Sequence, residues 1–135
     1  MAYPIADIEG IGPAQQAKFE SAGIKSVEQL LEKGSSPKGR KDLETATGID
    51  GKKILRFVNH ADLFRIDGIA GQFSELLEAA GVDTVNELKT RVPANLHAKL
   101  VEVNDKKNIV NQVPGLSRVE DFISQAKSLK PMVTY

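Results

Sequence analysis

Four short segments of the sequence pair glycine with a large apolar residue in a way that could expose backbone amides. Each begins with glycine followed by isoleucine or leucine and ends where a helix is expected to begin: residues 10–13, 48–51, 68–71 and 115–118. Glycine accepts a positive φ, and the apolar residue would fill the gap between two helices. The first amides of the following helix have no intrahelical acceptor and lie at the positive end of its dipole. Such a turn can bind an anion.

Basic side chains gather around the turn at residues 48–51. Residues 33–56 contain seven basic and three acidic residues, whereas residues 66–135 contain eight basic and nine acidic ones. This local excess suits either contact with phosphates or a solvated helix face beside a mobile loop. The basic residues of the candidate patch are Lys38, Arg40, Lys41, Lys52, Lys53 and Arg56. The candidate nucleic-acid-binding residues are Gly10, Ile11, Gly12, Gly48, Ile49, Gly51, Lys52, Lys53 and Arg56.

The sequence contains no pattern of side chains suited to catalysis or metal binding. Cysteine is absent, and the two histidines, His60 and His97, have no neighbours at metal-ligand spacing. Ser35 and Ser36 follow a glycine but lack the motif of a nucleophile elbow, and no phosphate-binding loop of the Gly-x-x-x-x-Gly-Lys type occurs. We therefore expect a protein that is not an enzyme, with no catalytic residue, metal or cofactor.

The composition is that of an ordinary globular protein. Hydrophobic residues make up 41% and charged residues 27% of 135 residues, and the formal net charge is zero. A neutral chain lacks the strongly basic character that would by itself favour nucleic acid. No apolar run approaches the ~18 residues of a membrane span, and the first residues do not resemble a secretory signal. These features predict a soluble cytoplasmic protein with no membrane partner.

An internal repeat organises the chain. When the sequence is shifted by 58 residues, eight of the 25 positions from Ile8 to Glu32 are identical, including Gly10 with Gly68 and Gly23 with Gly81. The glycines and apolar positions recur while the polar residues differ, which is typical of two copies of one packing unit.

The later parts of the two copies match at a different offset. Residues 54–61 resemble residues 119–126, so the second copy carries about seven extra residues, expected around 106–113. We predict two tandem repeats, residues 1–65 and 66–135, that pack into one compact body because no flexible linker separates them.

Apolar residues recur at helical spacing, and no stretch alternates as a strand would. The spacing of Val119, Phe122, Ile123 and Ala126 is one example. Capping boxes are expected at Ser26, Thr84 and Ser117, and Gly23 and Gly81 are placed as left-handed glycines after helices. The fold is predicted to be all-α, with helix starts near Pro13, Val27, Pro37, Gly51, Gly71, Val85, Ala94 and Arg118, and a further short helix near Lys106.

Residues 8–31 resemble the hairpin and following helix of the helix-hairpin-helix superfamily of DNA-binding modules. Both copies together are similar to a family of small bacterial proteins of unknown function built from tandem helix-hairpin-helix units. The resemblance implies a SAM-like helical bundle and contact between hairpin amides and DNA phosphates.

Two classes of function follow from these features. The first is a weak, sequence-independent DNA binder that uses hairpin amides and the local basic patch. The alternative is a protein-protein interaction or scaffold module in which the hairpins are only structural, and a neutral chain with an acidic second copy favours it.

Overall fold

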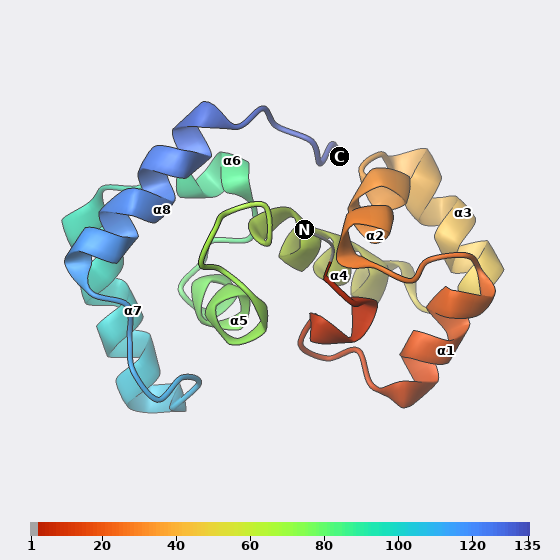
Figure 1. Ribbon diagram of the computed structural model, residues 1–135, viewed down its shortest axis with the longest axis horizontal. Coiled ribbons are helices and arrows are strands. Elements are labelled where there is room, and N and C mark those ends of the chain that lie inside the picture. The colour runs from red at the N-terminus through yellow and green to blue at the C-terminus, as the bar shows by residue number, and fades with distance from the viewer. Residues whose placement is uncertain (1–2) are drawn as a thin grey trace. The chain divides into compact units, whose positions relative to one another are not determined.

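The computed structural model describes residues 3–135, and within this range the chain forms helices and no β-strand (Figure 1). A single isolated bridge pairs Pro4 with Ser26 in these residues. The all-α class predicted from the sequence is confirmed. The helices are η1 (Ile5–Asp7), α1 (Pro13–Ser21), α2 (Val27–Gly34), α3 (Pro37–Thr47), α4 (Gly51–Leu63), α5 (Gly71–Ala79), α6 (Val85–Leu88), α7 (Pro93–Lys107) and α8 (Leu116–Ser128).

Local signals place most helix starts correctly. Helices α1 to α6 begin at the residues expected, and α7 begins one residue before Ala94. The predicted capping box at Ser117 is wrong, because α8 begins at Leu116 with Gly115 as its N-cap. The separate helix expected near Lys106 is also absent from the described residues, since α7 continues to Lys107.

The basic residues that follow Lys33, which one of the two interpretations placed beside a mobile loop, lie in a helix. Helix α2 ends at Gly34 and α3 begins at Pro37, so only Ser35 and Ser36 connect them. The Ser36 hydroxyl accepts a hydrogen bond from the Gly39 amide at 3.0 Å, which caps α3.

The chain divides into two compact units. Unit 1 holds the described residues up to Asp62 together with Met132–Tyr135, and unit 2 is Leu63–Pro131. In unit 1, α3 packs against α1 and α2. Phe19 of α1 is fully buried and meets Phe57 of α4 edge to face, with ring centroids 6.2 Å apart.

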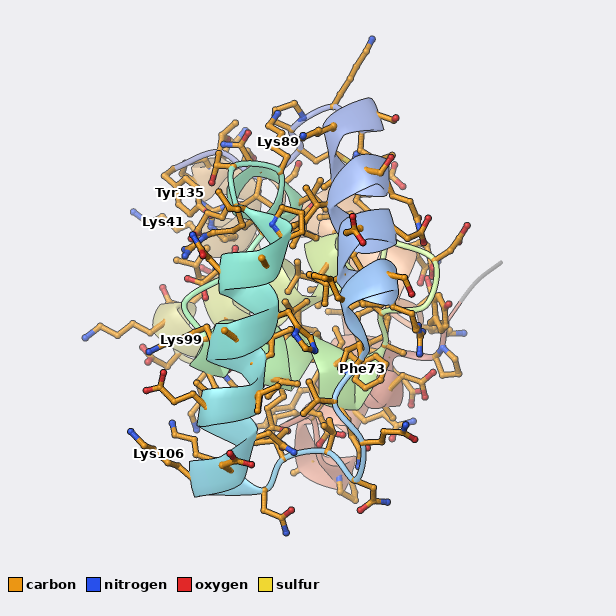
Figure 2. The ribbon with its side chains drawn as sticks, turned by 90° about the vertical axis from the view of Figure 1, so that its left-hand side faces the viewer. Lys41, Phe73, Lys89, Lys99, Lys106 and Tyr135 are labelled. Atoms are coloured by element: carbon orange, nitrogen blue, oxygen red, sulfur yellow. The ribbon has the colours of Figure 1, made fainter. Side chains whose placement is uncertain are left out.

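Unit 2 is built around α7 and α8, which run side by side (Figure 1). Helix α5 packs against α7, and α6 packs against α8. Phe122 and Ile123 of α8 lie in its core with Leu76 and Leu77 of α5. The outer face of α7 carries charge: Figure 2 shows Lys99 and Lys106 pointing away from it.

The repeated glycines adopt matching backbone conformations. Gly10 and Gly68 have φ of 95° and 97°, and Gly23 and Gly81 have φ of 86° and 91°. The prediction that Gly23 and Gly81 are left-handed glycines is confirmed.

The later parts of the copies differ where the extra residues were expected. Gly48 ends α3 in the left-handed conformation, whereas Asn108 does so for α7 at φ 50°. Eight residues then separate α7 from α8, against three between α3 and α4. Gly115 has φ −67°, whereas the first glycine of each of the other three turns has a positive φ. The turn at 115–118 therefore differs from the other three.

Candidate nucleic-acid interface

The hairpin at residues 10–13 keeps few amides for a ligand. Ile11 is buried as the expected plug between helices. Gly12 is the N-cap of α1, and its amide donates to Oε1 of Gln15 at 3.2 Å. Pro13, the first residue of the helix, has no N–H. This turn therefore has fewer free donors than its glycines suggest.

Arg56 lies against this first hairpin although it belongs to the helix that follows the second. A Cβ atom built on Gly10 would stand 2.9 Å from Nη1 of Arg56 and 3.3 Å from Cε1 of Phe57. The Arg56 guanidinium thus covers Gly10, and Arg56 is half-buried. The structure brings together two candidate site residues, Gly10 and Arg56, that are distant in sequence.

The hairpin at residues 48–51 is occupied by a carboxylate of the chain itself. Oε2 of Glu44 accepts a hydrogen bond from the Gly51 amide at 2.7 Å, at the N-terminus of α4. The Gly48 amide donates to the carbonyl of Glu44, and the Ile49 amide donates to Oγ1 of Thr47. Glu44 therefore stands where the sequence predicts a phosphate oxygen.

The basic patch is smaller than the sequence predicts. Lys38, Lys41, Lys52 and Lys53 are exposed, but Arg40 is only 9% exposed. Its guanidinium donates to three backbone carbonyls, so its assignment to an accessible patch is corrected. The remaining lysines are also spread out. Lys41 precedes the hairpin by two helical turns, or roughly 10 Å along α3.

The hairpin at residues 68–71, which was not among the candidate site residues, differs from the other two in the first turn of the helix that follows it. No proline interrupts the first turn of α5, and its N-cap Ala70 makes no side-chain bond. Arg118 lies beside it, with Nη2 3.5 Å from the Gly68 carbonyl and the guanidinium 5.4 Å from the ring centroids of both Phe73 and Phe122. A cavity of about 290 Å³ opens there.

A reciprocal side-chain clamp fixes the start of this third hairpin. Oε1 of Gln125 accepts from the Asp67 amide at 2.9 Å, and Nε2 of Gln125 donates to the Asp67 carbonyl at 3.2 Å. Sequence reasoning missed this residue, because a glutamine on a helix surface carries no signal of its partner 58 residues away.

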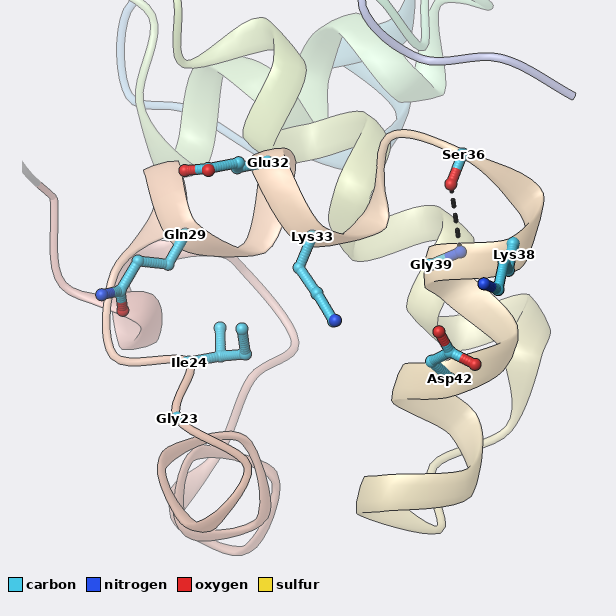
Figure 3. Close-up of a pocket in the computed structure, with 9 residues that line it drawn as sticks. All are labelled: Gly23, Ile24, Gln29, Glu32, Lys33, Ser36, Lys38, Gly39 and Asp42. Carbon is cyan, nitrogen blue, oxygen red and sulfur yellow. Dashed lines mark hydrogen bonds between the residues drawn. The ribbon is translucent and has the colours of Figure 1, made fainter.

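Each unit has a cleft beside the helix that begins with proline, α3 in unit 1 and α7 in unit 2. In unit 1 it measures about 460 Å³, and Lys33 projects into it while Lys38 and Asp42 stand on its far wall (Figure 3). In unit 2 it measures about 410 Å³, and Arg91 donates to the Gly81 carbonyl at 2.9 Å on its margin. Charges of both signs line the first cleft, so it does not select an anion.

Comparison with known proteins identifies the family. The chain belongs to the family described as a domain of unknown function (DUF4332), whose model matches residues 9–129. No curated protein and no solved structure matches the chain significantly. Within residues 3–135, none of the helices is both long enough and apolar enough to cross a membrane.

Proposed function

We propose that this protein is a non-enzymatic protein-interaction module whose hairpins act as structural joints. The observation that carries the proposal is the use of the hairpin amides within the chain: Gly51 donates to Glu44, and Gly12 donates to Gln15. An amide that already donates to a carboxylate must lose that bond before it can bind a phosphate. We place the protein in the helix-hairpin-helix superfamily, in the cytoplasm and in bacteria, and the matching glycine angles of Gly10 and Gly68 support the superfamily.

A second candidate function is weak DNA binding through phosphates. It is favoured by the exposure of Lys52 and Lys53, which follow the hairpin at 48–51, and by the start of α5 after the hairpin at 68–71, which has no side-chain cap. Binding of this kind is independent of base sequence and falls with salt, by about 0.9 in the log–log slope for each phosphate neutralised. If each of the four exposed lysines neutralised one phosphate, the slope would be about −3.6.

Glu44 allows the two functions to be separated. If the hairpin binds phosphate, Glu44→Gln removes the competing charge and raises affinity for a random duplex several-fold at low salt. The double variant Lys52→Ala with Lys53→Ala then reduces the magnitude of the salt slope by up to ~2. If the hairpin is a structural joint, we expect no saturable binding by the wild type or by Glu44→Gln. Fluorescence anisotropy across salt concentrations measures both.

The matched control is Glu75→Gln in unit 2. It removes one negative charge, as Glu44→Gln does, at a carboxylate to which the structure shows no hairpin amide donating. An equal rise in affinity for Glu75→Gln and Glu44→Gln would reflect net charge alone. Saturable binding that responds only to Glu44 and the two lysines would overturn the interaction module as the primary function.

A further inference from the structure

The segment Met132–Tyr135, called the strap below, is an extended stretch that unit 1 holds by its backbone. Thr134 donates its N–H to the Ser35 carbonyl at 2.8 Å, and its own carbonyl accepts from Nη2 of Arg40 at 2.6 Å. Two side-chain contacts follow at Tyr135. Its ring lies 5.8 Å from the Arg40 guanidinium, and its hydroxyl donates to Oδ1 of Asn59 at 3.3 Å. Residues 35, 40 and 59 come from three different parts of unit 1.

Arg40 of unit 1 binds this backbone through its guanidinium. Its Nη1 donates to the carbonyls of Gly34 and Ser35 at 2.9 and 3.1 Å, which fixes the guanidinium and leaves Nη2 aimed at the strap. Burial lowers the pKa of Arg40, while its interaction with Tyr135 acts in the opposite direction. Because a nearly buried guanidinium needs acceptors, the loss of the strap leaves a donor to be satisfied by another chain or by water.

The equivalent position in unit 2 shows that the fold does not require an arginine at this place. Helices α3 and α7 both begin with proline, and the fourth residue is Arg40 in one and Leu96 in the other. Leu96 is buried in the apolar core of unit 2. An arginine in place of a core leucine is therefore a specialisation of unit 1.

The strap itself is held lightly. Met132 and Thr134 are exposed, and Tyr135 is 72% exposed. Val133 is half-buried and no residue of the strap is fully buried, so its attachment depends largely on hydrogen bonds that any extended backbone can make. Exchange of this segment for another of the same kind would keep each of those backbone bonds.

We propose that the surface formed by Gly34, Ser35, Arg40 and Asn59 is a recognition site for an extended segment of a partner protein, and that the strap is its internal occupant. The segment it fits presents an N–H to Ser35, a carbonyl to Arg40 and then an aromatic side chain. The inference rests on the proposed function, since it names the kind of partner that the interaction module takes.

The test uses the full-length chain with the strap detached. Thr134→Pro removes the N–H that donates to Ser35, whereas the matched control Thr134→Ala keeps it. The probe is a fluorescent peptide of residues 130–135, titrated into each variant and followed by anisotropy. We expect saturable binding to Thr134→Pro with Kd on the order of 10⁻⁴–10⁻³ M, a range set by the few contacts.

Binding to the wild type and to Thr134→Ala should be weaker by about two- to tenfold, because a tethered strap of the same affinity competes at an effective concentration of about 1 mM. Adding Arg40→Lys to Thr134→Pro should abolish binding, since lysine lacks the fork that joins three carbonyls. A peptide with proline in place of threonine should not bind to any variant, and this control does not depend on the folding of a mutant.

Failure of the peptide to bind folded Thr134→Pro, as judged by circular dichroism, would overturn the recognition site. So would equal binding of the proline-containing peptide. A wild-type dimer that forms with rising concentration and is lost in Thr134→Pro would assign this site to a second copy's strap rather than to a foreign partner. The DNA titrations described above test the proposed function separately, so the two failures are distinguishable.

Discussion

The hairpins at Gly10 and Gly68 reach the same arrangement with residues from different sequence positions. Each glycine is covered by a phenylalanine ring, and the two rings, Phe57 and Phe122, are 65 residues apart as the repeat requires. Each is also covered by an arginine, but Arg56 immediately precedes its phenylalanine whereas Arg118 lies one helical turn before. In both copies, an arginine and a phenylalanine ring therefore cover the glycine. The phenylalanine comes from the equivalent position in the two copies, but the arginine does not.

The junction between α2 and α3 in unit 1 differs more from the junction between α6 and α7 in unit 2. In unit 1, Gly39 of α3 lies so close to the end of α2 that a Cβ atom would overlap the Lys33 carbonyl oxygen. In unit 2 the third residue of α7 is Asn95, which is exposed. The short two-residue connection of unit 1 thus requires glycine where unit 2 accepts a side chain.

The largest expected effect tests that difference. Gly39→Ala should destabilise the protein by about 3 kcal/mol, because a backbone oxygen cannot move aside as a flexible side chain would. Asn95→Ala, at the matching helix position in unit 2, should change stability by less than about 0.5 kcal/mol. Urea denaturation followed by circular dichroism measures both. Similar losses for the two variants would show that the junctions are equivalent after all.

A smaller effect tests the equivalence of the hairpins. Gly10→Ala and Gly68→Ala should each cost about 2 kcal/mol, because a positive φ disfavours alanine by ~1–2 kcal/mol and the new Cβ crowds an arginine and a phenylalanine. Gly23→Ala keeps the strain without the crowding, since no atom lies within 4 Å of its Cβ, and should cost about 1 kcal/mol. Values for Gly10→Ala and Gly68→Ala that differ by more than ~1 kcal/mol would break the comparison.

The smallest effect concerns the helix caps at the start of α2 and α6. Oε1 of Gln29 accepts from the amides of Lys25 and Ser26, and Glu87 occupies the equivalent place in unit 2. Burial, with Asp83 nearby, raises the pKa of Glu87, although Arg91 and a hydrogen bond from the Asp83 backbone lower it. The protonated form is thus favoured by folding, so this contribution to stability is present at low pH and is lost as pH rises through the raised folded-state pKa.

Glu87→Gln would give unit 2 the cap that unit 1 has. We expect it to stabilise the protein slightly at pH 7, by up to about 0.5 kcal/mol, and to flatten the pH dependence between pH 4 and 7. Thermal melts across this range, with Gln29→Glu as the reciprocal variant, provide the measurement. An unchanged pH profile in Glu87→Gln would show that the pKa of Glu87 is the same in the folded and unfolded states.

The helices and their boundaries could be predicted because their signals act over a few residues. Ser26 and Ser36 cap the helices that follow them, and Gly23 and Gly81 adopt positive φ after the helices that precede them. Each such choice depends on backbone sterics and on hydrogen bonds three or four residues away. The internal repeat adds a second copy of the same local evidence, which is why the hairpins could be located from sequence.

The state of the candidate site was decided by tertiary structure. Glu44 reaches the Gly51 amide, and Arg56 covers Gly10, through packing that joins separate helices. Arg40 was expected on a surface patch, yet it bonds to Thr134, 94 residues along the chain. A charged side chain has several partners of similar energy in the unfolded chain, water among them, and its own spacing in the sequence does not choose between them. Only the packed backbone brings one acceptor within reach and excludes the others.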